Sequence, residues 1–135
     1  MKVGVKGLKF DSAHYTRGSS AKCLSLHGHT FSLEVEVEGE IDPKTGMVMD
    51  FADLKSLVNE IIKEYDHKLI IPRRDFEKIK ISGPFMSKLK FLDYPEATTE
   101  YIALDIAKKL HNKVGKRVTV KLYEGKNNYV ETVYP

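Results

Sequence analysis

The sequence predicts an α+β domain, in which a four-stranded antiparallel sheet carries two helices on one face. Three observations favour this fold class. Segments with alternating apolar and polar residues lie near both ends of the chain, two segments with helical periodicity lie between them, and a turn-rich segment separates the helices. Alternation is typical of half-buried antiparallel strands, whereas an apolar helical face must pack on another layer. The expected order is strand, strand, helix, inserted hairpin, helix, strand, strand.

The first strand is expected over residues 3–10, where apolar residues alternate with polar ones and Gly7 marks a bulge. Carried on at the same parity, Ser12 and His14 project to the same side of the chain. A loop follows at residues 15–26, because glycine and serine cluster there.

The clearest strand pattern covers residues 29–38, in which apolar residues alternate with serine and glutamate. This pattern predicts a half-buried antiparallel strand. His27 and His29 have the same parity as its apolar residues. Both imidazoles are therefore expected on the covered face, where the strand begins.

Two helices are expected to provide that cover. Asp50 can cap the first helix, which spans about residues 51–65 and has its apolar residues on one face. The second helix begins near Thr98 and Thr99, whose hydroxyls can cap it, and ends at Gly115. Both helices can therefore lie on the same side of the sheet.

The remaining segments complete the sheet. Residues 118–124 and 129–134 are expected to form the last two strands, joined by a turn at residues 125–128. Glu124 has the parity of the apolar residues in its strand. Residues 76–92 suggest a short hairpin inserted between the helices. Four strands leave exposed sheet edges, which favours association into larger assemblies.

Composition limits the classes of protein. At 135 residues, with 41% hydrophobic and 30% charged residues, the chain is expected to be one globular domain over residues 1–135. No stretch approaches the ~20 apolar residues of a membrane span, and the start lacks the apolar segment of a signal peptide. A single cysteine allows no internal disulfide, which favours a cytoplasmic location. The net charge of +3 comes from interspersed residues and gives no argument for nucleic acid as a partner.

The spacing of three histidines predicts a metal site. His27 and His29 are two apart in an extended chain, so their imidazoles reach a common point, and His14 can arrive from the neighbouring strand. Three imidazoles leave one tetrahedral position of Zn²⁺ open, which is the pattern of a catalytic site. Cys23 lies four residues before His27, and a nearby cation would favour its thiolate as a base or nucleophile. The same thiol could instead be a fourth ligand that closes a structural site.

Polar residues outside this stretch could also do chemistry. Asp66 precedes His67 at the expected end of a helix, where the pair could relay a proton. Glu124 could accept two hydrogen bonds from the guanidine-like edge of a pterin or guanine. Thr98 and Thr99 are expected helix caps, and a helix N-terminus can also bind polar groups.

Taken together, the motifs resemble those of a known enzyme family. They follow its order and cover nearly the whole chain: Phe10-Asp-Ser-Ala-His14, Cys23-x3-His27-Gly-His29, Thr45-Gly-Met-Val-Met-Asp50-Phe, Tyr65-Asp-His67-Lys, Thr98-Thr-Glu100 and Leu122-Tyr-Glu124. The chain resembles the 6-pyruvoyl-tetrahydropterin synthase / 6-carboxytetrahydropterin synthase family. This resemblance implies the tunnelling fold, in which two helices cover a four-stranded antiparallel sheet. It also implies that subunits join into a barrel, usually a homohexamer with active sites at subunit interfaces.

The resemblance further implies a role for each candidate residue. The three histidines would bind zinc, and Cys23 would be the base that removes protons from the substrate side chain. Asp66 and His67 would assist as a proton relay. Glu124 would anchor the pterin ring, and the two threonines at the start of the second helix would line its pocket. The implied substrate is 7,8-dihydroneopterin triphosphate.

The product depends on finer features. The three-residue spacer between Cys23 and His27 resembles the carboxy enzymes of 7-deazaguanine (queuosine and archaeosine) synthesis, which cleave the substrate side chain and release acetaldehyde and triphosphate. The implied product is 6-carboxy-5,6,7,8-tetrahydropterin. A pyruvoyl product is the alternative, although the animal pyruvoyl enzymes have a longer spacer. Tyr65, where the family usually has leucine, and the extra segment 73–95 depart from the family near the relay and could alter substrate or product.

Other classes of function stay open on the sequence alone. A zinc hydrolase that uses metal-bound water would suit three histidines and makes no demand on Cys23. A non-enzymatic CysHis₃ zinc domain that binds a pterin or purine would use Cys23 as a ligand. Four basic residues are candidates for binding the triphosphate, and only their charge suggests this role: Arg17, Lys22, Arg73 and Arg74.

Overall fold

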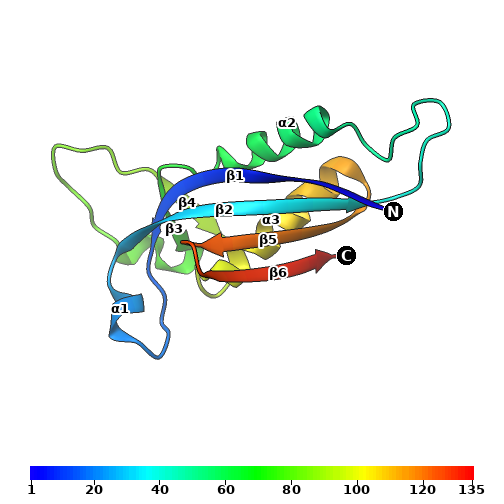
Figure 1. Cartoon of the computed structure of the whole chain (residues 1–135). Helices are drawn as coiled ribbons and strands as arrows, with labels where there is room; N and C mark the ends of the chain where they lie inside the picture. Colours follow the sequence, from blue (N-terminus) through cyan, green and yellow to red (C-terminus); the bar gives the residue numbers. More distant parts are fainter.

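The computed structural model describes residues 1–135 and contains a six-stranded sheet in the order β4-β3-β1-β2-β5-β6. The strands are β1 (Lys2–His14), β2 (His27–Glu38), β3 (Lys68–Pro72), β4 (Leu89–Leu92), β5 (Arg117–Glu124) and β6 (Asn128–Tyr134). Helices α2 (Phe51–Ile62) and α3 (Thr99–Val114) cover one face of the sheet (Figure 1). Two short helices, α1 (Ala21–Leu24) and η1 (Arg73–Lys78), lie in the connections between strands.

The core lies between the sheet and these two helices. The four apolar residues of β2 that alternate with polar ones, Phe31, Leu33, Val35 and Val37, are all completely buried. Leu33 and Val35 lie opposite Leu122 and Val120 of the antiparallel strand β5. Apolar residues of α2 and α3 complete one continuous cluster of 23 buried residues. The structure therefore confirms the prediction, made from this alternation, that the sheet has a covered and an uncovered face.

The predicted helix boundaries agree closely with the structure. The Asp50 side chain accepts hydrogen bonds from the first backbone amides of α2, and Thr98 caps α3 in the same way. Gly115 ends α3 with a positive φ of 66°, a conformation that glycine adopts without steric cost. Helix α2 ends at Ile62, about one turn before the predicted end, and turns lead from there to His67. The register shift between Val5 and Leu8 confirms the bulge at Gly7.

The inserted hairpin and the strand count were predicted wrongly. The sheet has six strands, not four, and β3 pairs parallel with both β1 and β4, so the sheet is mixed. Residues 73–78 form η1, and the chain crosses back over residues 79–88 before β4. A parallel neighbour cannot be reached by a tight turn, which is why this connection is long. Strand β3 contains the buried run Leu69-Ile70-Ile71, and parallel strands covered on both faces lack the alternation that marks a half-buried strand.

None of the helices is long and apolar enough to cross a membrane.

Candidate metal centre

The three predicted histidines meet where β1 ends and β2 begins. The antiparallel register pairs His14 with His27 and Ser12 with His29, so all three imidazoles share the helix-covered side of the sheet. Their ring centroids are 4.8 Å apart for His14 and His27, 5.2 Å for His14 and His29, and 4.7 Å for His27 and His29. Strand pairing therefore brings together residues that are up to fifteen positions apart in the sequence.

Glu124, at the end of β5, joins this group. Its Oε1 lies 3.0 Å from His14 Nε2 and 2.8 Å from His29 Nε2. One ligand atom from each of these four side chains lies within 4.8 Å of all the others. Ligand atoms about 2.1 Å from a zinc ion would be separated by at most about 4.2 Å, so small side-chain rotations would suffice to enclose a metal. We call these four residues the His/Glu cluster.

Hydrogen bonds orient two of the imidazoles toward the centre of the cluster. His14 Nδ1 lies 2.7 Å from the Ala97 carbonyl oxygen, and His27 Nδ1 lies 2.6 Å from the Ser25 carbonyl oxygen. A carbonyl oxygen only accepts, so each Nδ1 carries the proton and donates it. In the neutral imidazole, Nε2 is then a free lone pair directed into the cluster. Such outer hydrogen bonds are typical of metal-binding histidines.

Two polar atoms in the cluster lack a suitable partner from the protein. In His14, Nε2 faces the acceptor Glu124 while Nδ1 already donates, yet neutral imidazole has only one N–H. His29 Nε2 is buried and makes no hydrogen bond, although Glu124 lies close to it. A cation bound by the imidazoles would satisfy both nitrogens, and the nearby carboxylate would offset part of its charge. The donor set of imidazole and carboxylate suits zinc and other divalent transition metals.

The protonation states also suit a cation. Burial lowers the pKa of the His29 imidazole, although the Glu124 carboxylate partly offsets this effect. The His14 side chain, 3.0 Å away, is the main cause that lowers the pKa of Glu124, the nearby His29 side chain lowers it less, and burial opposes both. Glu124 is therefore ionised and His29 neutral at pH 7, which are the forms that bind metals.

Cys23 does not belong to the His/Glu cluster. It lies in α1, is half-buried and has a free thiol. Its backbone carbonyl oxygen accepts a hydrogen bond from the Thr16 amide at 2.7 Å, which closes the loop that follows β1. The four side chains that approach one another thus include Glu124 and not Cys23. This arrangement disfavours the closed CysHis₃ alternative.

Asp66 and His67 form a pair beside β1. His67 Nδ1 lies 3.0 Å from Asp66 Oδ2, and the Asp11 amide donates to Asp66 Oδ1 at 2.9 Å. The His67 amide donates to the Asp11 carbonyl oxygen at 2.6 Å, and His67 has a positive φ of 55°. The hydrogen bond from the Asp11 backbone lowers the pKa of Asp66. Asp66 is therefore ionised, and the neighbouring His67 imidazole is 77% exposed.

The pair lies at an open cleft that borders only one residue of the His/Glu cluster. His67 lines this cleft of about 680 Å³ together with Asp11, Ala13 and Thr30, and His29 also lines it, whereas His14, His27 and Glu124 do not. Asp11, Ala13 and Thr30 alternate with Ser12, His14 and His29 along β1 and β2, so the side chains of these three residues project to the uncovered face. Within one chain, the predicted relay therefore shares a cleft with only one of the predicted metal ligands.

The two threonines lie at the start of α3, close to the cluster. Thr98 Oγ1 accepts a hydrogen bond from the Tyr101 amide, as expected of a cap. Thr99 is almost fully buried. Ala97, which holds His14, directly precedes them, so the start of α3 forms one wall of the site.

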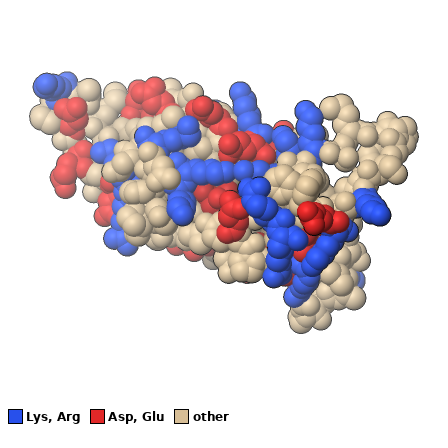
Figure 2. All heavy atoms as spheres, turned by 180° about the vertical axis from the view of Figure 1, so that it is seen from behind, with Lys and Arg blue, Asp and Glu red and all other residues tan.

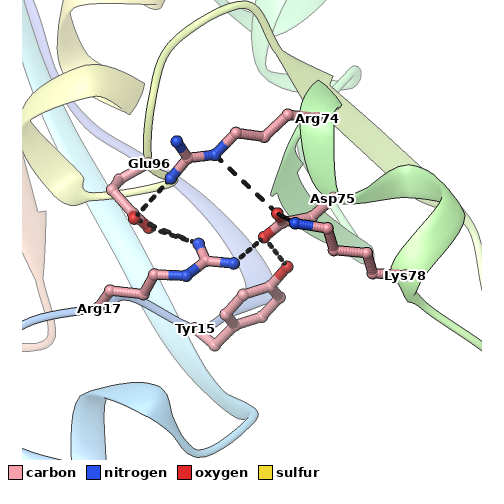
Figure 3. A network of polar contacts seen from close by, with 6 residues as sticks. All are labelled: Tyr15, Arg17, Arg74, Asp75, Lys78 and Glu96. Atoms are coloured by element: carbon pink, nitrogen blue, oxygen red, sulfur yellow. Dashed lines mark hydrogen bonds and ion pairs between the residues drawn. The ribbon is translucent and has the colours of Figure 1, made fainter.

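Sequence reasoning missed a second polar cluster, which is built around Asp75 (Figure 3). The buried Asp75 carboxylate accepts hydrogen bonds of 2.6 Å from both Tyr15 Oη and Arg17 Nη2. Arg17 and Arg74 also donate to Glu96. We call these five residues the Asp75 network. Tyr15 follows His14, and Glu96 precedes Ala97, so the network fixes both chain segments that hold the His14 ring.

The Asp75 network also bears on the basic residues considered as triphosphate ligands. Arg17 and Arg74 both pair with carboxylates inside it, and Arg73 pairs with Asp93 at 2.5 Å. Figure 2 shows that basic and acidic side chains are interspersed over the face seen from behind. Three of the four candidates are thus already neutralised by the protein itself. Lys22 is the exception.

Comparisons with known proteins show what the chain is similar to. The family model described as 6-pyruvoyl tetrahydropterin synthase matches residues 4–134. The chain is 35% identical over 134 residues to a 6-carboxy-5,6,7,8-tetrahydropterin synthase of Haemophilus influenzae, covering 93% of this chain and 94% of that protein. It is 41% identical over 125 residues to a dihydroneopterin monophosphate aldolase of Pyrococcus furiosus, covering 90% and 89%.

Solved structures share the fold. The 6-pyruvoyltetrahydropterin synthase of Plasmodium vivax superposes with a TM-score of 0.80 at 21% identity, covering 99% of this chain and 97% of that one. The corresponding enzyme of Caenorhabditis elegans gives a TM-score of 0.72 at 22% identity, covering 100% and 97%. These likenesses confirm the α+β fold class.

Proposed function

The chain belongs to the 6-pyruvoyl tetrahydropterin synthase family, and we propose that it is a zinc-dependent lyase that converts 7,8-dihydroneopterin triphosphate to 6-carboxy-5,6,7,8-tetrahydropterin. Its relatives are named as tetrahydropterin synthases, so the chain is an enzyme of the lyase class with a small pterin as substrate. One observation carries the proposal: three histidines and Glu124 converge with their ligand atoms within 4.8 Å.

We propose that His14, His27 and His29 hold the zinc ion through Nε2. Bound zinc would act as a Lewis acid that polarises the side-chain hydroxyls of the substrate and acidifies the neighbouring C–H bonds. The Ala97 and Ser25 carbonyl oxygens keep two of these rings in the tautomer that binds metal. Three imidazoles leave room for a substrate oxygen, as a catalytic site requires.

Cys23 is the proposed base. Its thiol is free and half-buried, and it lies on the same loop that leads into His27. Proximity to a bound cation would favour the thiolate, which could then remove a proton from the substrate side chain. This role makes no use of Cys23 as a metal ligand, in keeping with the makeup of the His/Glu cluster.

Asp66 and His67 are the proposed proton relay, and we propose that they serve the zinc site of a second subunit. They lie beside an open cleft that is lined by His29 but by neither His14 nor His27. Asp11, Ala13 and Thr30 in this cleft have the opposite strand parity to the zinc ligands, so their side chains project to the other face of the sheet. This placement supports an oligomer, which we propose to be a homohexamer with active sites between subunits.

Glu124 is the proposed anchor for the pterin ring. Its lowered pKa keeps it ionised, and a carboxylate can accept two hydrogen bonds from the amino and ring N–H groups of a pterin. Thr98 and Thr99 lie on the same wall and would line the ring pocket. Buried polar contacts of this kind would also select against rings that lack these donors.

A second candidate reaction is aldol cleavage of dihydroneopterin monophosphate. One observation favours it: identity to the Pyrococcus furiosus aldolase is 41%, against 35% to the Haemophilus influenzae carboxy synthase. The three-residue spacer between Cys23 and His27 favours the carboxy product instead. A carboxy product would place the enzyme in 7-deazaguanine synthesis.

The test is to incubate zinc-loaded protein separately with 7,8-dihydroneopterin triphosphate and with the monophosphate, and to identify products by mass spectrometry. We expect 6-carboxytetrahydropterin and acetaldehyde from the triphosphate. A 6-hydroxymethyl pterin from the monophosphate alone would favour the aldolase, and a pyruvoyl product would favour the biopterin-type reaction. The Cys23→Ala variant is the matched control, because a zinc hydrolase would keep its activity without the thiol.

A further inference from the structure

One wall of the cleft that contains His67 is formed by a segment that has no role in the proposed reaction. This wall is the segment between η1 and β4, which extends from the body of the molecule (yellow-green in Figure 1). Ile81, Phe85 and Met86 line the cleft opposite the ends of β1 and β2. The volume of about 680 Å³ lies in the range of small-molecule sites. The cleft can therefore accept part of a ligand and not only solvent.

The charged residues of the cleft are predominantly basic. Lys68 and Lys88 line it together with the imidazoles of His29 and His67, and Ser87 adds a hydroxyl group. Asp11 is the one acidic residue among the lining residues, and its Oδ1 already accepts a hydrogen bond from Thr30 Oγ1 at 2.5 Å. The cleft thus offers an excess of hydrogen-bond donors and positive charge to an incoming group.

The two lysines differ from the arginines around η1 in one decisive respect. Arg17, Arg73 and Arg74 each pair with a carboxylate. Lys68 Nζ donates a hydrogen bond only to the Asp66 carbonyl oxygen, at 3.4 Å, and neither Lys68 nor Lys88 forms an ion pair. Unpaired ammonium groups on flexible stems can converge on an anion of varied geometry, which is how lysine binds phosphates.

We propose that this cleft binds the phosphate groups of the substrate, with Lys68 and Lys88 as the main ligands. The proposal rests on the proposed function, because the phosphates sit on the side chain whose bonds are broken. His67 lines the same cleft, so a phosphate held there would bring the reacting carbons close to the relay. The segment 79–88, which departs from the family pattern, would then help to select phosphorylated pterins.

Calorimetric titration of inorganic tripolyphosphate into the intact protein tests the cleft without any turnover. We expect Lys68→Met and Lys88→Met each to weaken binding by about 10-fold or more, in line with the loss of a charged hydrogen bond. Lys55→Met, on the exposed face of α2, is the matched control and should bind as the wild type does. Lys88→Arg should restore most of the affinity. Equal affinity in all variants, or no binding at all, would overturn the proposal.

Kinetics separates failure of the cleft from failure of the proposed function. With 7,8-dihydroneopterin triphosphate, the cleft variants should raise KM far more than they lower kcat, whereas the control Lys55→Met should leave both unchanged. Turnover with an unaltered KM would refute the cleft and leave the lyase intact. Lysine-dependent tripolyphosphate binding without any turnover would support the cleft and refute the lyase.

Discussion

Two polar clusters adjoin His14, and they differ in how far the protein satisfies them. In the Asp75 network, every arginine has a carboxylate partner, and the buried Asp75 accepts from Tyr15 and Arg17. Asp75 Oδ1 lacks a hydrogen bond but faces the Arg74 and Lys78 side chains, each at 4.0 Å. In the His/Glu cluster, three imidazoles surround a single carboxylate, and His29 Nε2 is unpartnered.

The difference separates a structural site from a functional one. Burying a polar group without a partner costs free energy, so folding alone favours clusters in which opposite charges are paired, as in the Asp75 network. A cluster with more imidazoles than its one carboxylate can satisfy gains stability when a cation binds. We infer that the Asp75 network holds the His/Glu cluster in place, and that the His/Glu cluster binds the metal.

The largest effect is expected from removing a metal ligand. His27→Ala should lose bound zinc and lower turnover by more than the 10- to 100-fold typical of outer-shell changes. Metal analysis and the product assay measure both quantities. His111→Ala is the control, because the His111 ring packs on Tyr134 and does not belong to the His/Glu cluster. Full zinc content in His27→Ala would argue against the assigned site.

Removing Cys23 should separate chemistry from metal binding. Cys23→Ala is expected to reduce turnover by about 10²- to 10⁴-fold, the usual contribution of a general base. Its zinc content should be unchanged, because Cys23 lies outside the His/Glu cluster. A variant that loses zinc together with activity would make the thiol a ligand.

Substitutions in the Asp75 network should mainly lower the free energy of unfolding. Asp75→Leu leaves the Arg17 guanidinium and Tyr15 hydroxyl without their shared partner. Loss of one member of a buried pair costs about 3–5 kcal/mol, and Arg17 is partly exposed, so we expect about 3 kcal/mol and a Tm lower by roughly 10 °C. Urea denaturation measures the loss. Lys78→Met, which removes an exposed cation near Asp75, should change stability by less than about 0.5 kcal/mol.

The same network predicts a pH dependence. Burial alone would raise the pKa of Asp75, but hydrogen bonds from Tyr15 and Arg17 lower it overall. A depressed pKa contributes stability above the unfolded value of about 3.9, and that stability is lost as the pH falls through the folded pKa. The advantage of the wild type over Asp75→Asn should therefore shrink below about pH 4. Denaturant unfolding at several pH values would show this, and a constant difference would refute it.

The smallest effect is expected at the start of α3. Thr98→Ala removes the hydroxyl that caps this helix and should cost about 1 kcal/mol. Zinc affinity should change little, because His14 bonds to the backbone of Ala97 and not to the cap. A large loss of zinc affinity would show that the cap, as well as the network, positions His14.

Alternation and short spacing explain what could be predicted from the sequence. The parity of β1, β2 and β5 was enough to bring three histidines and Glu124 to one face. The Asp75 network carried no such signal, because Asp75 meets Tyr15 and Arg17 across 60 and 58 residues of chain. Strand β3 was missed since Leu69, Ile70 and Ile71 form a continuous apolar run, which parallel strands share with buried helices.

X-ray absorption spectroscopy of the protein loaded with one equivalent of Zn²⁺ tests the central claim most directly. An open site formed by His14, His27 and His29 predicts only nitrogen and oxygen neighbours, at about 2.0–2.1 Å, with the outer-shell signal of imidazole rings. A sulfur neighbour at about 2.3 Å would contradict the claim, because Cys23 would then close the metal site and could not act as the base.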